Sequence, residues 1–268
     1  LGSILIYMLV GIRWGLGLFM DQIRLEDLAT AGRTLTVIID SLTVIGIFGL
    51  GRRLFGTMVG VMSGTLVALS VSNIQLSLFY RPEPFTMLLW VAAIWCMLNV
   101  LEKRRLRDHV ALAIVIGLTF GFRATSLSIL LPVAVTYAVA TKQALHYPDL
   151  ALDKAHLRKL VGYPMIAGLV SVITFCILQP YALIDLSKFL SDLSWETDIA
   201  RTAGQVPYTL QYVGTTSITY EIQQTMVWGL GIPLGVLAWA GLCFSLYRTM
   251  SRPRIGEALI VAGIVPTL

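Results

Sequence analysis

Long apolar blocks constrain the fold of this chain more than any other feature of its sequence. Seven blocks run for 14 to 24 residues with few charges, and an eighth begins near residue 256. About 20 apolar residues cross the hydrocarbon core of a bilayer. Each block is expected to be helical, because lipid offers no partners to free backbone groups. The seven blocks are 34–50, 57–79, 84–101, 109–122, 126–141, 160–178 and 224–247.

The charge content excludes a water-soluble domain. Charged residues make up 13% of the chain, whereas soluble domains carry about 25%. The Lys and Arg residues lie in short loops and are not interleaved with aromatic side chains, which excludes a nucleic-acid-binding protein. We therefore predict an all-α, polytopic transmembrane helical bundle that forms a single domain over residues 1–268. Since the chain begins without Met and ends inside an apolar run, we expect it to be a fragment truncated at both ends.

The distribution of basic residues predicts which loops face the cytoplasm. Four loops hold thirteen of the 20 Lys and Arg residues: 51–56, 102–108, 142–159 and 248–255. Cytoplasmic loops of membrane proteins carry such an excess. The four loops share one side only if residues 109–140 form two short helices with a hinge at 121–125, rather than one long helix. We therefore predict two short spans in this stretch.

That topology places four segments outside: 21–33, 80–83, 123–125 and 179–223. The last has 45 residues and is the longest loop. Four of its apolar residues have helical spacing, namely Leu186, Phe189, Leu190 and Leu193. They predict an amphipathic helix on the outer membrane surface. Residues 1–20 are long enough to span, but Arg13 and three internal glycines favour an interfacial helix.

Five charged residues lie toward the predicted outer face: Arg33, Asp40, Arg81, Glu83 and Arg123. Ionisable groups at membrane depth are costly and usually have a partner or a function. Plain structural roles stay open for four of them: Arg33 could snorkel to headgroups, Asp40 could bond to a neighbouring helix, and Arg81 with Glu83 could form a solvated turn. Arg123 at the hinge suits a phosphate, because a guanidinium group binds one bidentately.

The sequence offers no metal site and no nucleotide-binding motif. His109, His146 and His156 lie on the predicted cytoplasmic side without zinc-site spacing. Glycine-rich phosphate loops and nucleophile elbows are absent. Any chemistry is therefore expected at the outer bilayer surface, where a lipid-borne substrate fits better than a nucleotide.

A series of short motifs resembles one family of membrane enzymes in order and spacing. The matching segments are Gly32-Arg33, 40–44, 51–56, 77–85, Gly117-Leu118 with Arg123-Ala124-Thr125, Pro180-Tyr181, 207–212 and 228–231. They resemble the C-type-fold glycosyltransferases that use lipid-phosphate sugars. This clan includes the protein O-mannosyltransferases and the lipid A aminoarabinose transferase, and the bacterial family 39 members are the most similar.

The resemblance implies an inverting transfer of a sugar from a polyprenyl-phosphate-linked donor to an acceptor hydroxyl at the outer face of the cell membrane. Arg123 would hold the leaving phosphate, and Glu83 would orient the acceptor or a cation. Six further residues would contact substrate: Arg33, Asp40, Tyr80, Arg81, Tyr208 and Tyr212. The catalytic base would be an acidic motif before residue 1, and segment 179–223 would close over the substrates.

Three positions depart from the family pattern. Glu83 stands where Asp is usual, Arg123 where Lys is frequent, and Leu78 where His is frequent. The loss of a polar group at Leu78 puts substrate contacts there in doubt. A catalytically inactive homologue and a secondary transporter, with Asp40 lining its path, are the alternatives. The sequence leaves open the sugar, the acceptor (protein or glycolipid) and any need for a divalent metal.

Overall fold

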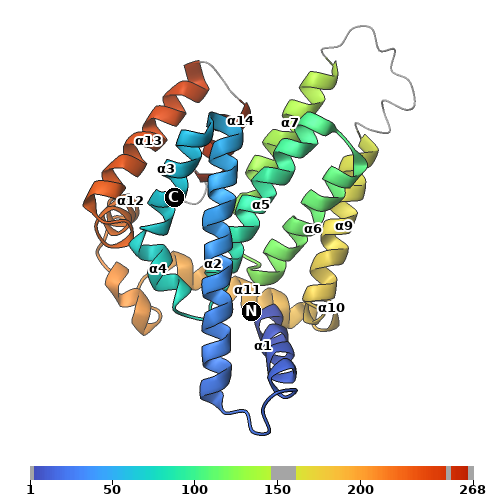
Figure 1. Ribbon diagram of the computed structural model, residues 1–268, viewed down its shortest axis with the longest axis vertical. Coiled ribbons are helices and arrows are strands. Elements are labelled where there is room, and N and C mark those ends of the chain that lie inside the picture. Colours follow the sequence, from blue (N-terminus) through green and yellow to red (C-terminus); the bar gives the residue numbers. More distant parts are fainter. Residues whose placement is uncertain (1–2, 146–160, 252–254, 265–268) are drawn as a thin grey trace.

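A computed structural model describes residues 3–145, 161–251 and 255–264 and folds them into a bundle of helices (Figure 1). The first half comprises α1 (Ser3–Leu16), α2 (Leu25–Phe55), α3 (Thr57–Ala68), α4 (Val71–Ser77), α5 (Pro82–Lys103), α6 (Leu106–Phe122), η1 (Leu127–Ile129) and α7 (Leu130–Leu145). The second half comprises α9 (Tyr163–Leu178), α10 (Tyr181–Ile184), α11 (Leu186–Arg201), η3 (Pro207–Tyr212), α12 (Ser217–Gln223), η4 (Gln224–Gly229), α13 (Ile232–Ser251) and α14 (Ile255–Ile264). The described residues contain no strand, so the all-α prediction is confirmed.

Three of the described helices are long and apolar enough to cross a membrane: α2, α5 and α13. The pair α3 and α4 adds a fourth if its two helices, bent by 59°, count as one span. The helices α6, α7 and α9 have 17, 16 and 16 residues, fewer than the roughly 20 that a bilayer core requires. The full set of seven spans therefore stays a prediction.

The basic segments gather at one end of the bundle. Figure 1 shows the α2–α3 turn, the α5–α6 turn and the ends of α7 and α13 at its upper end. We call this the basic end. Arg104 in the α5–α6 turn donates to Gln143 Oε1 of α7 over 2.8 Å. The described parts of the four predicted basic loops thus lie at one end, whereas residues 146–159 and 252–254 of these loops lie outside the described residues. The side of the membrane that this end faces stays a prediction.

Arg53 ties α2 to α5 near the basic end. Its Nη2 atom donates to Asn99 Oδ1 over 2.9 Å and to Glu102 Oε2 over 2.7 Å. Its guanidinium carbon also lies 4.9 Å from the centre of the Trp95 ring. The Arg53 side chain is only 19% exposed, so these bonds are screened less than surface pairs are.

Close helix packing depends on glycines at two helix pairs. A Cβ on Gly60 of α3 would lie 2.7 Å from the Phe48 carbonyl oxygen of α2. A Cβ on Gly117 of α6 would lie 2.7 Å from the Ser171 carbonyl oxygen of α9. Small residues allow two helix backbones to approach this closely. Helices inside a membrane associate in this way, because burial of apolar surface contributes little to their association there. The pair α6 and α9 is therefore held at a short, fixed separation.

The opposite end contains α1, the α4–α5 turn and the α6–α7 break, and we call it the hinge end. It lies at the bottom of Figure 1. A second apolar cluster fills it, formed by the buried side chains of Ile4, Phe85 and Phe122. The larger cluster lies nearer the basic end, around Met97, Leu112 and Leu259.

Three predicted boundaries were wrong, each for a local reason. Residues 25–33, predicted as external loop, form the first turns of α2, where Asp27 Oδ2 accepts the Arg24 backbone N–H over 2.9 Å. An acidic side chain in the first turn stabilises such a helix start. The predicted span 57–79 breaks between α3 and α4. The reason is the polar sequence at this point: Ser70, Ser72 and Asn73 are of residue types that favour caps and turns over the interior of a helix.

The third wrong boundary is the start of the predicted span 224–247. The regular helix α13 begins at Ile232, after the π-helical η4 and the positive φ of 79° at Gly231. Pro233 explains the break, because its ring would clash with the carbonyl of Gly229 in a continuous helix. At the first turn of α13 the same proline is tolerated.

The other helix predictions hold. The stretch 109–140 is interrupted: α6 ends at Phe122 and α7 begins at Leu130, which confirms two helices with a hinge. The amphipathic helix predicted within 179–223 is α11. The helix predicted within residues 1–20 is α1, while its place at the membrane interface stays a prediction.

Candidate functional site

An aromatic stack brings the candidate residues Glu83 and Arg123 to the same end of the bundle. Phe85, two residues after Glu83, stacks on Phe122, the neighbour of Arg123, with ring centroids 5.0 Å apart and planes at 12°. Tyr80 packs edge-on against Phe85 at 6.1 Å. Such pairs contribute about 0.5–1.5 kcal/mol beyond their area. The stack therefore fixes the start of α5 against the end of α6.

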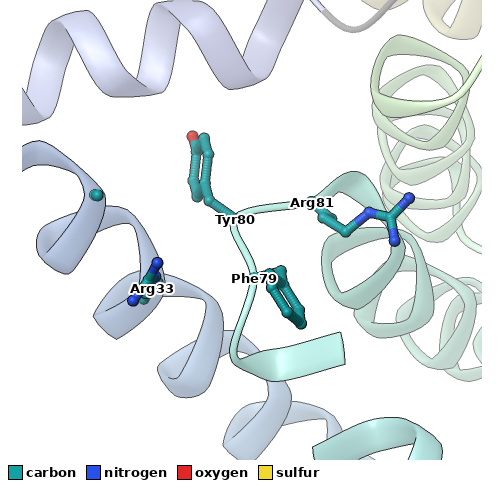
Figure 2. A pocket seen from close by; sticks show the side chains of 5 residues that line it. Arg33, Phe79, Tyr80 and Arg81 are labelled. Atoms are coloured by element: carbon teal, nitrogen blue, oxygen red, sulfur yellow. The ribbon is translucent and has the colours of Figure 1, made fainter. Parts of the chain in front are cut away.

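A pocket of about 430 Å³ opens between α2 and the turn before α5, lined by Ala29, Arg33, Phe79, Tyr80 and Arg81. Three of the predicted substrate-binding residues, Arg33, Tyr80 and Arg81, thus line one pocket. Figure 2 shows Arg33 and Arg81 on opposite sides of the loop that carries Tyr80. The two guanidinium groups do not point at each other, so this conformation presents two separate cations.

Tyr80 has a structural partner as well as a pocket face. Its hydroxyl donates to the Leu5 carbonyl oxygen of α1 over 2.8 Å. Its ring packs on the α2 backbone, where a Cβ on Gly32 would lie 3.1 Å from the ring. Burial raises the pKa of the Tyr80 phenol, so the hydroxyl stays protonated and donates at neutral pH. Tyr80 thereby holds α1 against α2 and offers the pocket its ring.

Glu83 lies in the first turn of α5, where the helix dipole stabilises a negative charge. Its Oε2 atom is 3.6 Å from Arg81 Nε and has no hydrogen-bond partner among the described residues. The Glu83 side chain is 27% exposed, against 57% for Arg81. This half-buried carboxylate has acceptor capacity left for a hydroxyl group or a cation.

Arg123 follows the last residue of α6 and is exposed. Its Nε donates to Thr125 Oγ1 over 3.2 Å. In the described part of the chain it forms no ion pair, so the rest of its donor fork can meet an anion. That geometry suits a bidentate phosphate or carboxylate.

An apolar groove of about 500 Å³ runs between α6, α7 and α9 and is also lined by Phe189 and Leu193 of α11. Its wall includes Phe120, Ala124, Leu130, Gly168, Phe175 and Phe189. Phe189 of α11 packs on Phe175 of α9 with centroids 6.1 Å apart. The groove was not predicted from the sequence. Ala124, which follows Arg123 in the chain, is part of its wall.

Gln179, another residue that sequence reasoning missed, connects three helices beneath this site. It is 4% exposed, its Nε2 donates to the Gly121 carbonyl oxygen over 2.8 Å, and its Oε1 accepts the Ser3 hydroxyl over 3.0 Å. The signal that was available in the sequence is the polar side chain of Gln179 directly after the apolar run of α9.

Three of the predicted substrate-binding residues lie apart from the two pockets. Asp40, one of them, is half-buried on α2 and has no hydrogen bond or ion pair to any described residue. Tyr208 in η3 is 65% exposed. Tyr212 packs edge-on against Tyr220, with centroids 5.3 Å apart. None of these three residues lines either pocket. Their predicted role in substrate binding stays a prediction.

Within residues 3–145, 161–251 and 255–264, no three His, Cys, Asp or Glu side chains are close enough to hold a metal ion. The three cysteines in these ranges are free thiols. The candidate site therefore consists of Glu83 and the two arginines at the pocket, and of Arg123, which precedes Ala124 of the groove wall.

Comparisons with known proteins show the family and the fold of the chain. The family described as dolichyl-phosphate-mannose-protein mannosyltransferase matches residues 5–178. No curated protein sequence matches the chain. The chain is similar in structure to the Archaeoglobus fulgidus oligosaccharyltransferase, solved as a complex with Zn and sulfate, at a TM-score of 0.55 and 17% identity. The match covers 99% of this chain and 37% of that one, so the chain spans well under half of that protein's length.

Proposed function

The chain belongs to the dolichyl-phosphate-mannose-protein mannosyltransferase family, and from this premise we propose that it transfers a sugar from a polyprenyl-phosphate-linked donor to an acceptor hydroxyl. The family membership and the fold agree with the resemblance drawn from the sequence motifs. We propose that the reaction takes place at the outer face of the cell membrane, in a multi-pass protein whose basic end faces the cytoplasm.

One observation carries the proposal: the residue directly after Arg123 lines the apolar groove. Ala124 and Leu127 are both in its wall, and Arg123 is exposed next to them in the chain. A polyprenyl phosphate has the matching pattern, a long apolar chain that ends in an anion. In this proposal the chain lies in the groove, and the phosphate accepts hydrogen bonds from Arg123. Charge-assisted bonds of this kind are about twice as strong as neutral ones.

Arg123 then stabilises the leaving group. As the bond between the anomeric carbon and the phosphate oxygen breaks, negative charge grows on the phosphate, and a fixed cation lowers the energy of that transition state. The acceptor hydroxyl attacks from the opposite face of the sugar ring. Its proton passes to a general base, for which we propose an acidic motif on a segment before residue 1.

The pocket beside Glu83 is proposed as the acceptor side of the site. The Glu83 carboxylate orients the acceptor hydroxyl or holds a cation, and Arg33 and Arg81 contact polar groups of the acceptor. We further propose that Asp40, Tyr208 and Tyr212 contact substrate once segment 179–223 closes over it. The acceptor is a protein or a glycolipid, and the bilayer presents the donor.

A donor comparison tests the proposed function. Membranes from cells that express the full-length product of the gene encoding this chain are incubated with radiolabelled mannose on a polyprenyl phosphate or on a nucleotide. We expect label in acceptor only from the lipid-linked donor, and only in membranes that contain the protein. Transfer from the nucleotide sugar after endogenous polyprenyl phosphate has been removed would contradict the proposal.

A further inference from the structure

The helix α6 ends at Phe122, and no proline or glycine directly after it accounts for this end. No proline or glycine occurs between Arg123 and Leu131. Pro132 disfavours helix around residue 128, the carbonyl with which its ring would clash, but it does not reach Phe122. Arg123 nevertheless adopts an extended backbone conformation with φ −146° and ψ 100°. Thr125, Ser126 and Ser128 favour a turn in this segment, and a contact from outside the segment adds to that preference directly after Phe122.

Gln179 makes that contact at the atom where it matters. In a continuous helix the Gly121 carbonyl would accept the backbone N–H of Thr125. Here it accepts the side-chain Nε2 of Gln179 over 2.8 Å. A helix end leaves such carbonyls without partners, and an unpaired one that is buried costs about 1–3 kcal/mol. The amide of Gln179 therefore replaces the bond that a longer α6 would have formed.

Gln179 is itself held in place from several sides. The Ser3 hydroxyl donates to its Oε1 over 3.0 Å, and its backbone N–H donates to the Phe175 carbonyl over 2.8 Å. Its target is fixed as well, because a Cβ on Gly121 would lie 2.7 Å from Ile4 Cδ1. The amide thus reaches Gly121 from a rigid corner between α1 and α9.

We propose that Gln179 is a positioning residue that keeps α6 from extending past Phe122 and so holds Arg123 in its extended conformation next to Ala124, which lines the groove. The inference rests on the proposed function, in which Arg123 binds the donor phosphate. Without the amide, α6 gains the Thr125 bond to Gly121. Arg123 then turns from an extended to a helical conformation, which changes the direction of its side chain relative to the groove.

The first test measures the break itself and does not depend on activity. Gln179→Met keeps the size of the side chain and removes its donor. Amide hydrogen exchange at Ala124 and Thr125 should become slower in Gln179→Met, because these two amides gain helical bonds, whereas the amides of Arg123 and Ser126 already have backbone acceptors. Ser3→Ala, which leaves the bond to Gly121 in place, should not slow it. Unchanged or faster exchange in Gln179→Met would overturn the inference.

The second test measures the preference for phosphate in the full-length protein, as the ratio of the Kd for a polyprenol to the Kd for the matching polyprenyl phosphate. Gln179→Met should lower this ratio about tenfold and should lower it no further once Arg123 is alanine. The inference alone would be refuted if Gln179→Met left the ratio unchanged, or if Gln179→Met lowered the ratio by the same factor in an Arg123→Ala background. If the wild-type protein itself showed no preference for the phosphate, both the inference and the proposed function would be refuted. Gln179→Asn, too short to reach Gly121, repeats both tests if Gln179→Met does not fold.

Discussion

Replacement of Arg123 with alanine should lower the rate of sugar transfer per folded molecule by about two to three orders of magnitude. Arg123 is exposed at the α6–α7 break, has no ion pair among the described residues and precedes Ala124, which lines the apolar groove. A single preorganised donor to a developing oxyanion contributes about 3–4 kcal/mol to catalysis. The measurement is turnover with a polyprenyl-phosphate-linked sugar in detergent, normalised to folded protein.

Two further variants separate catalysis from anchoring. Arg123→Lys should keep partial activity, because it retains the cation and loses the bidentate fork. Thr125→Ala, which removes the hydroxyl that accepts Arg123 Nε, should affect turnover much less than Arg123→Ala. If Arg123 only anchors the hinge to headgroups, Arg123→Ala will change folding yield and leave turnover intact. A well-folded Arg123→Ala protein with near-normal turnover would remove Arg123 from the site.

The second large effect is expected from filling the groove. Gly168 of α9 lines it, and a Cβ at this position would meet nothing within 4 Å. Gly168→Phe should therefore fold, while its ring takes the space of two or three methylene groups of a bound lipid chain. Each buried methylene is worth about 0.8 kcal/mol, so the KM for the lipid-linked donor should rise roughly thirtyfold.

Gly241→Phe is the matched control. Gly241 lies in α13, a Cβ there also meets nothing within 4 Å, and it does not line the groove. Its KM should stay near that of the wild type, which would show that an added ring on a helix is not harmful in itself. An equal rise of KM in both variants, or no rise in Gly168→Phe, would argue against the groove as the site of the lipid chain.

The helices were predictable from the sequence, because a long apolar segment within a bilayer can satisfy its backbone hydrogen bonds in few ways other than as a helix. The break between α6 and α7 was also predictable, since only two helices bring the basic loops to one side. The start of α2 was not, because residues 25–33 are too polar to count toward a span and helix propensity there is decided by the first-turn carboxylates. Pro233 was a readable signal for the start of α13, but the apolar run around it outweighed it.

The site was only partly predictable, because it depends on contacts between distant segments. Arg33, Tyr80 and Arg81 were found from charge and motif, and they line one pocket. The bond from Tyr80 to Leu5 joins residues 75 positions apart, and periodicity within a helix carries no information about it. The groove is similar: its wall comes from α6, α7 and α9, each of which alone looks like an ordinary apolar span, and from the amphipathic helix α11.

Photo-crosslinking of the donor lipid tests the central claim most directly. A polyprenyl phosphate with a photoreactive group in its first isoprene units is bound to the full-length protein, and the crosslinked peptides are identified by mass spectrometry. We predict labels in the groove, around Phe120 to Leu130 and around Gly168 to Phe175, which excess unlabelled polyprenyl phosphate removes and Arg123→Ala weakens. Labels spread over the lipid-exposed faces of α2 and α13, unaffected by competitor, would contradict the account.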